Sequence, residues 1–127
     1  MAARKKPVRT VVQVKRVYEA PVDSDGWRVL VDRLWPRGIS KDAARIDLWL
    51  RDIAPSDALR RRVHDDPSTW DSFVADYAGE LMRPPADAAV ATLRARIAQG
   101  PVTLLYAARD TARNNATALR AWLDENP

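Results

Sequence analysis

Apolar positions along this chain repeat with two different spacings, which predict strands and helices in alternation. Residues 11–18 have the β-branched content of a strand, and residues 27–34 have the composition of a second one. Residues 46–51 alternate between apolar and polar side chains, which indicates a third, half-buried strand with a helix as the alternative. Residues 102–107 form a continuous apolar run, as expected of a strand covered on both faces.

Apolar residues three and four positions apart predict helices between and after these strands. The clearest of them begins at Pro67, after Asp66 as its N-cap, and carries an apolar stripe from Trp70 to Leu81. The adjacent prolines Pro84 and Pro85 end it. The other predicted helices are residues 41–45 with Ser40 as cap, a short helix opened by residues 54–56, residues 87–99, and residues 111–125.

The order helix, buried strand, helix in the last third of the chain predicts an α/β fold. We expect a single layered domain, with a mostly parallel sheet flanked by helices, over residues 11–127. A chain of 127 residues is long enough to bury a core without disulfides or a structural metal. Residues 1–10 are predicted to be a disordered basic arm.

The composition excludes several kinds of chemistry. The chain has no cysteine, which rules out thiol catalysis and thiolate metal sites, and its single histidine, His64, leaves no histidine cluster. We therefore expect no metal and no cofactor. No segment approaches the roughly 20 apolar residues of a membrane span, so we expect a cytoplasmic protein without a membrane partner.

The net charge of +4 comes entirely from the first ten residues. Arg4, Lys5, Lys6 and Arg9 lie there with no acidic residue, and the remaining 17 basic side chains balance 17 acidic ones. A folded part without net charge lacks the usual footprint of a protein that binds duplex nucleic acid. Contact with nucleic acid through the basic arm stays open as an alternative.

The stretch DRLWPRGISK, residues 32–41, follows an apolar run and contains the most unusual combination of side chains. A segment built only to turn the chain would favour Asn, Gly, Asp or Ser. Here Arg33, Trp35 and Arg37 lie within five positions, and Pro36 and Gly38 frame Arg37 in a way that can direct its guanidinium. We interpret the stretch as one wall of an anion-binding site.

A second polar segment, residues 106–115, follows the last predicted strand and leads directly into the last predicted helix. Ligands of open α/β sheets bind beyond the carboxyl ends of the strands, and a helix start offers free N–H groups to an anion. The predicted ligand-binding residues of the two segments are Arg33, Trp35, Arg37, Arg109 and Asn114.

Whether the site catalyses a reaction is left open by the sequence. In an enzyme, Asp110 or Asp47 would be the general base, but no pairing of a nucleophile with a base is visible. Structural roles compete with these assignments, because Asp110 can cap a helix and Arg33 can pair with a neighbouring acid.

The leading hypothesis is a protein that binds an anionic small molecule bearing a phosphate or a carboxylate. One alternative is a nucleic-acid-associated or regulatory protein that uses the basic arm. Another is a dimeric protein-interaction module, since Trp and Arg are frequent at interface hot spots. The chain could be a monomer or a homodimer.

At these residues the chain resembles the YeaO-like branch of the domain-of-unknown-function 488 family, which occurs in bacteria and archaea. The residues that carry the resemblance are 14–18, 31–38, 48–50, 53–56 and 104–110, with Asn114 and Asn115. The resemblance implies an α/β domain but no established reaction.

The chain departs from the family pattern at two places. Arg113 stands where many members have His, and the order at residues 64–67 is His-Asp-Asp-Pro in place of His-Asp-Pro. A sister branch carries Cys and His near Tyr106 and the start of the final helix, and these are absent here. If members of the family use a histidine at either of these two places for acid–base catalysis, this chain has no histidine at that place.

Overall fold

The computed structural model describes residues 12–127, so the predicted basic arm, residues 1–10, lies outside the described residues. The strands are β1 (Val12–Arg16), β2 (Trp27–Leu30), β3 (Leu48–Trp49) and β4 (Val102–Tyr106). The helices are α1 (Lys41–Ala44), α2 (Asp57–Asp65), α3 (Trp70–Leu81), α4 (Ala86–Ile97) and α5 (Asn115–Glu125). Short 3₁₀ turns cover Asp23–Asp25, Arg51–Ile53 and Pro67–Thr69.

The four strands form one sheet in the order β1-β4-β2-β3, and every neighbouring pair is parallel. The predicted α/β class with a mostly parallel sheet is therefore confirmed. The last strand in the sequence occupies the centre, where Leu104 is paired with Val14 of β1 on one side and Val29 of β2 on the other. This position explains why the whole of β4 is buried and apolar except for Thr103.

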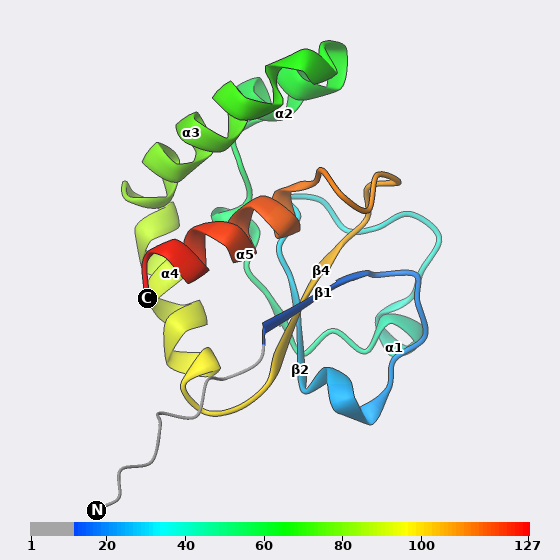
Figure 1. Ribbon diagram of the computed structural model, residues 1–127. Coiled ribbons are helices and arrows are strands. Elements are labelled where there is room, and N and C mark those ends of the chain that lie inside the picture. Colours follow the sequence, from blue (N-terminus) through cyan, green and yellow to red (C-terminus); the bar gives the residue numbers. More distant parts are fainter. Residues whose placement is uncertain (1–11) are drawn as a thin grey trace, which may run out of the picture.

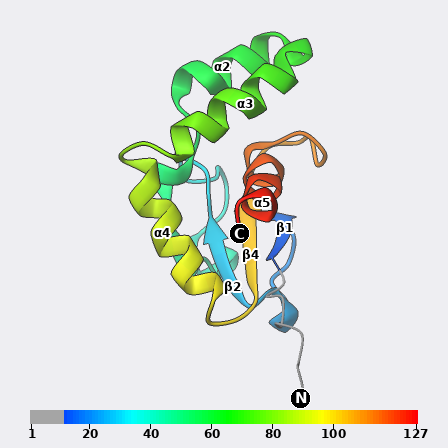
Figure 2. The same ribbon diagram turned by 60° about the vertical axis from the view of Figure 1, so that its left-hand side comes forward.

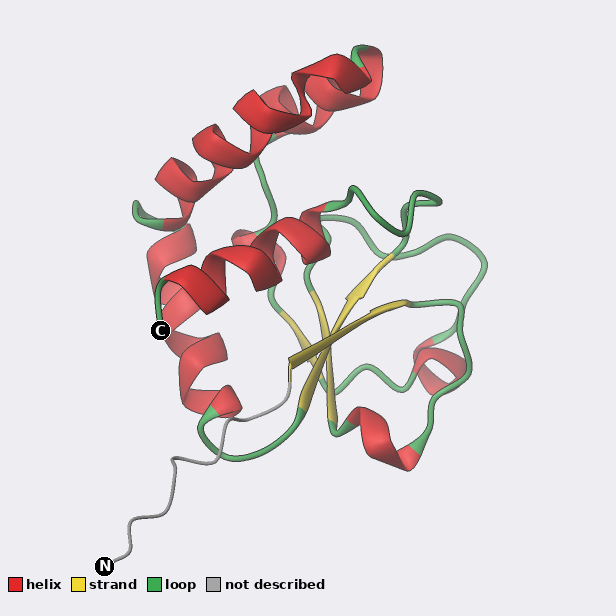
Figure 3. Ribbon diagram, viewed as in Figure 1, coloured by secondary structure: helices red, strands yellow, loops and turns green. Residues whose placement is uncertain are grey.

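Alternate residues of the strands face two different layers (Figure 1). Val29 and Leu104 pack into the main core, which also contains residues of α3, α4 and α5. Leu30 and Leu105 point to the other face, where α1 and the segment after β2 cover them. In the secondary-structure view of Figure 3, helices thus lie on both sides of the central strands.

The helices α2 and α3 form a hairpin that extends past the carboxyl ends of the strands, as both Figure 1 and Figure 2 show. Tyr77 of α3 anchors this hairpin, because its buried hydroxyl donates to the carbonyl of Ile53 at 2.6 Å. None of the helices within residues 12–127 combines the length and the apolar composition that crossing a membrane requires.

The predicted caps at Ser40 and Asp66 are confirmed. The hydroxyl of Ser40 accepts a hydrogen bond from Ala43 N at the start of α1. Ser56, the last residue of the segment predicted to open a short helix, accepts one from Leu59 N and caps α2. Asp66 accepts one from Ser68 N in the 3₁₀ turn that opens the predicted helix at Pro67.

Two predicted boundaries are wrong by four residues. Strand β2 ends at Leu30, not at residue 34, because both the carbonyl and the carboxylate of Asp32 bind groups outside a strand ladder. Helix α5 begins at Asn115, not at residue 111. The carboxylate of Asp110 accepts hydrogen bonds from Ala112 N and Arg113 N, which folds residues 110–113 into a turn before the helix.

Candidate functional site

The carboxyl ends of the two central strands are joined by one half-buried carboxylate, that of Asp32 just after β2. One of its oxygens accepts a hydrogen bond from Ala107 N, after β4, at 2.9 Å. The other accepts one from the side-chain amide of Asn115, at the start of α5, at 3.1 Å. The same amide nitrogen donates to the carbonyl of Val31 at 2.9 Å. Asp32 therefore fixes three segments around the end of the sheet.

The surroundings of Asp32 make its carboxyl group harder to ionise than that of an ordinary aspartate. Burial raises the pKa of Asp32, while the hydrogen bonds from Asn115 and Ala107 and the positive charge of Arg60 oppose that rise without cancelling it. A carboxyl group with a raised pKa can accept or release a proton closer to neutral pH than an ordinary one. The position also offers a hydrogen-bond acceptor at the place where ligands of α/β sheets bind.

Two arginines, Arg33 and Arg60, approach this end of the sheet from different elements; we call them the arginine pair. Arg33 follows Asp32, and its Nη2 donates to the carbonyl of Ala54 at 3.2 Å. Arg60 belongs to α2 and forms an ion pair with Asp57. The Nε atoms of both arginines are buried and have no hydrogen-bond partner.

The two guanidinium groups act on the same surroundings. Hydrogen bonding and charge from Arg60, with a smaller contribution from the charge of Arg33, lower the pKa of Asp57. Arg60 also acts on Asp32, and both Asp32 and Arg33 influence the pKa of Tyr77, which burial raises. The charge of Arg60 thus acts on both Asp32 and Asp57, and the charge of Arg33 acts on Asp57 and Tyr77.

Trp35 and Arg37 were also predicted as ligand-binding residues, but the structure does not place their side chains with that of Arg33. The Trp35 ring packs on the α1 side of the sheet, edge-to-face against Trp49 with ring centroids 5.6 Å apart, and its Nε1 donates to Ile39 O. Arg37 is exposed, and its carbonyl accepts a hydrogen bond from the Tyr18 hydroxyl at 2.8 Å. The indole is therefore engaged within the chain, while the Arg37 guanidinium faces solvent.

The loop after β4 holds Arg109, Asp110 and Asn114. Arg109 is exposed. The backbone hydrogen bonds from Arg113 and Ala112 lower the pKa of Asp110, as in a carboxylate that stabilises a turn. Asn114 is buried and caps α5: its side-chain oxygen accepts from Thr117 N, and its amide donates to Asp110 O, both at 2.9 Å.

Asp47, the other predicted general base, precedes β3 at the amino end of that strand. Its carboxylate accepts a hydrogen bond from Arg28 N at 2.9 Å. Asp110 follows the carboxyl end of β4, so the structure does not bring Asp47 and Asp110 together. Within residues 12–127, no three His, Asp or Glu side chains cluster closely enough to hold a metal ion.

Two hollows of the surface lie away from these residues. One of about 420 Å³ separates the end of β3 from α4, and one of about 360 Å³ separates α2 from α3. Neither includes Arg33, Arg37 or Arg109.

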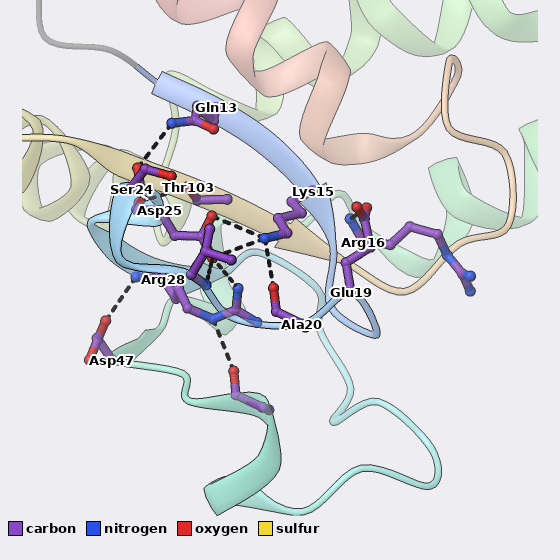
Figure 4. Close-up of polar contacts among 12 residues, drawn as sticks. Gln13, Lys15, Arg16, Glu19, Ala20, Ser24, Asp25, Arg28, Asp47 and Thr103 are labelled. Atoms are coloured by element: carbon purple, nitrogen blue, oxygen red, sulfur yellow. Dashed lines mark hydrogen bonds and ion pairs between the residues drawn. The ribbon is translucent and has the colours of Figure 1, made fainter.

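A second polar cluster, which sequence reasoning missed, lies on the α1 face of the sheet (Figure 4). Asp25, 2% exposed, accepts hydrogen bonds from Lys15 of β1 at 3.1 Å and from Arg28 of β2 at 2.7 Å. Thr103 of β4 donates to the carbonyl of Asp25 at 2.7 Å. Arg28 Nε donates to Ala44 O at 3.0 Å, while its Nη2 is buried without a partner. We call these four side chains the sheet-face network.

The sheet-face network keeps Asp25 ionised. Burial raises the pKa of this carboxyl, but hydrogen bonds from Val22 N, Lys15 and Arg28 outweigh burial, and the pKa lies below its ordinary range. Because its members bind one another across three strands and a turn, we assign the network to stability.

Sequence reasoning also missed Asp32, Asn115 and Arg60 as members of the site. Asp32 and Asn115 are the chain neighbours of Arg33 and Asn114, which the sequence predicted as ligand-binding residues. The feature that could have identified them is their position in the polar segments that follow predicted strands. Arg60 is one of three consecutive arginines in α2, and composition alone does not distinguish it from Arg61 and Arg62.

Comparisons with known proteins agree on one family. The family model described as "Inactive DUF488-N3 subclade" matches residues 11–126. An uncharacterised protein of Mycobacterium tuberculosis is 44% identical over 115 residues, which cover 91% of this chain and 95% of that protein. The uncharacterised protein YeaO of Escherichia coli is 40% identical over 112 residues, covering 88% and 96%. No solved structure matches the chain at a significant level.

Proposed function

The chain belongs to the YeaO-like DUF488 family, and from this premise we propose that it binds an anionic small molecule, bearing a phosphate or a carboxylate, at the carboxyl end of its sheet. The observation that carries the proposal is the arginine pair. Arg33 and Arg60 each have a buried Nε–H without an acceptor. An unsatisfied buried donor costs about 1–3 kcal/mol, more on a charged group, and an oxyanion would supply the missing acceptor.

The position of the arginine pair supports the proposal. Arg33 comes from the segment after β2 and Arg60 from α2, so the two donors belong to separate elements beside the carboxyl end of a central strand. This is where open α/β sheets bind their ligands. Arg37 and Arg109 are exposed on the loops after β2 and β4, and in this proposal they lie at the solvent-exposed rim of the site. It gives Trp35 a packing role and Asn114 a capping role, because their polar groups are already engaged.

Binding without turnover fits this chain best. The matching subclade is described as inactive. Arg113 stands at the position where, by the resemblance described above, many members of the family have a histidine. The proposal assigns no catalytic role to Asp110 or Asp47, because each carboxylate accepts backbone hydrogen bonds at a different end of the strands.

We expect phosphate or a small carboxylate to raise the thermal stability of the protein by mass action, by about 2.7 kcal/mol at 100 times Kd. Arg33→Gln and Arg60→Gln should each weaken binding by about 10- to 100-fold, because each removes a charged donor worth about 1.5–3 kcal/mol. Thermal unfolding with and without inorganic phosphate or a small carboxylate measures the first effect, and titration calorimetry with the same anions measures the second.

The matched control is Arg61→Gln, which removes the same charge from an exposed position on the same helix. Its affinity should stay within about twofold of the wild type, the small effect expected of an exposed, solvent-screened charge. Equal losses in all three variants would show a general effect of net charge. The proposal would be wrong if no anion bound to the wild-type protein.

A further inference from the structure

The larger of the two surface hollows has charged side chains on one side and small side chains on the other. It measures about 420 Å³ and lies between α4 and the end of β3 with the 3₁₀ turn Arg51–Ile53. On the helix side it is lined by Ala88, Ala89 and Thr92, which are too short to fill it. Sites for small molecules measure about 300–1,000 Å³, so the hollow is large enough for a small ligand.

The guanidinium of Arg51 is held at this hollow by a chain of contacts. Its Cζ lies 4.2 Å from the centroid of the Trp49 ring, and both residues line the hollow. Trp49 is itself fixed, because its Nε1 donates to the carbonyl of Asp32 at 2.7 Å and its ring packs edge-to-face against Trp35. A guanidinium that stacks on an aromatic ring keeps its N–H donors in its own plane, where they can bind a carboxylate through two parallel hydrogen bonds. Arg51 is therefore positioned as a donor.

Asp52, the next residue, lines the same hollow and carries the opposite charge. Both side chains are exposed, and neither belongs to an ion pair formed among residues 12–127. Arg51 and Asp52 therefore do not neutralise each other. A ligand of one charge would be attracted by one of the two groups and repelled by the other, whereas a ligand that carries both charges is complementary to both.

We propose that this hollow binds a small zwitterion, an amino acid with a short apolar side chain. Its carboxylate binds the guanidinium of Arg51, its ammonium group binds the carboxylate of Asp52, and its side chain lies over Ala88 and Ala89. The site goes beyond the proposed anion-binding function and does not depend on it, because the arginine pair does not line this hollow.

Three small molecules with the same hydrocarbon chain test the proposal on the wild-type protein. 2-Aminobutyrate carries both charged groups, butyrate lacks the ammonium group, and propylamine lacks the carboxylate. We expect 2-aminobutyrate to bind about tenfold or more tightly than either of the others, since tenfold corresponds to about 1.4 kcal/mol. Titrations followed by the chemical shifts of backbone amides measure the affinities and locate the site. The largest shifts should belong to residues 49–52 and 88–92.

Two charge variants assign the preference to the two side chains. In Arg51→Gln, 2-aminobutyrate should bind within about twofold of propylamine, because its carboxylate has lost its cationic partner. In Asp52→Asn, it should bind within about twofold of butyrate, because its ammonium group has lost its anionic partner. The matched controls are Arg61→Gln and Asp71→Asn, which remove the same charges from exposed positions outside the hollow and should keep the wild-type preference.

A third variant tests the hollow itself without changing a charge. Ala88→Leu places a larger side chain in the space and should weaken the binding of 2-aminobutyrate by about tenfold or more. Alanine and leucine both favour helices, so α4 should keep its structure. Ala91→Leu, at an exposed position of the same helix that does not line the hollow, is the control and should bind like the wild type.

Three results would overturn the proposal. Failure of the wild-type protein to bind 2-aminobutyrate would show that the hollow does not take this ligand class. Equal affinity for all three molecules would show that the two charges do not act together. Binding that survives Ala88→Leu, or shifts confined to another part of the molecule, would place the ligand elsewhere. The comparison of the three molecules on the wild-type protein stands even if a variant does not fold. Arg51→Gln should leave the binding of inorganic phosphate unchanged, so this proposal and the proposed function fail independently.

Discussion

Replacing Asp25 with alanine lowers the expected free energy of unfolding by about 3–5 kcal/mol, the usual cost of removing one partner from a buried ion pair. Asp25 is the only carboxylate that accepts hydrogen bonds from the side chains of Lys15 and Arg28 among the described residues. Arg28 is 3% exposed, so solvent cannot replace the lost partner. Urea denaturation of the variant and the wild type measures the difference, provided that the free energy of unfolding depends equally on urea concentration in both proteins.

The control is Asp23→Ala, which removes an exposed carboxylate from the same 3₁₀ turn and should change stability by less than about 0.5 kcal/mol. The pH dependence provides a second check. Because the pKa of Asp25 is lowered in the folded protein, the unfolded chain binds its proton more readily. The contribution of Asp25 is therefore present above the ordinary pKa of a carboxyl group and is lost as the pH falls toward the lowered one. Equal losses in the Asp25 and Asp23 variants would contradict the role of the network.

Gly26→Ala is expected to be about as damaging, at about 3–5 kcal/mol, because it combines steric overlap with backbone strain. Gly26 has φ of +63°, and a Cβ atom there would lie 2.2 Å from the carbonyl oxygen of Pro101. That oxygen accepts a hydrogen bond from Trp27 N at 3.0 Å, so the two backbones cannot separate without breaking the start of the β2–β4 pairing. Thermal and urea unfolding measure the loss.

Gly38→Ala separates strain from overlap. Gly38 also has positive φ, at +75°, but apart from Gly38 and its two chain neighbours no residue has an atom within 4 Å of the position that a Cβ would take. We expect a loss of about 1–3 kcal/mol from strain alone. If the two glycine variants lost the same stability, the close approach of Gly26 to Pro101 would have no energetic role.

The sequence predicted those parts of the fold that depend on neighbouring residues. The cap at Ser40 and the buried strand over Val102–Tyr106 follow from local side-chain chemistry and local periodicity. The central place of β4 depends on contacts between distant segments, which no local pattern contains. The prediction that the last helix begins at residue 111 was wrong because the carboxylate of Asp110 accepts hydrogen bonds from Ala112 N and Arg113 N and forms a turn. The same side-chain chemistry can cap a helix or form a turn, and helix propensity does not distinguish the two.

The candidate site could be predicted only in part, for a similar reason. Arg33 was identified from its unusual neighbours, but the unpartnered Nε atoms of Arg33 and Arg60 exist only once α2 lies against the end of the sheet. Asp25 and Arg28 look like ordinary surface charges beside a turn, and their burial follows from the packing of a 3₁₀ turn over the sheet. Burial of a charge is set by tertiary structure, so sequence reasoning has no direct access to it.

The strand order has a consequence for how the protein is made. A ribosome releases β1, β2 and β3 long before β4, yet β1 pairs within this sheet with β4 alone, and β2 pairs with β4 on one side. Until residues 102–106 emerge, the nascent chain exposes strand edges and apolar faces that have no partner. The sheet therefore assembles around its last strand, after most of the chain has been synthesised. A nascent chain stalled before Val102 would present this unfinished sheet to chaperones and proteases.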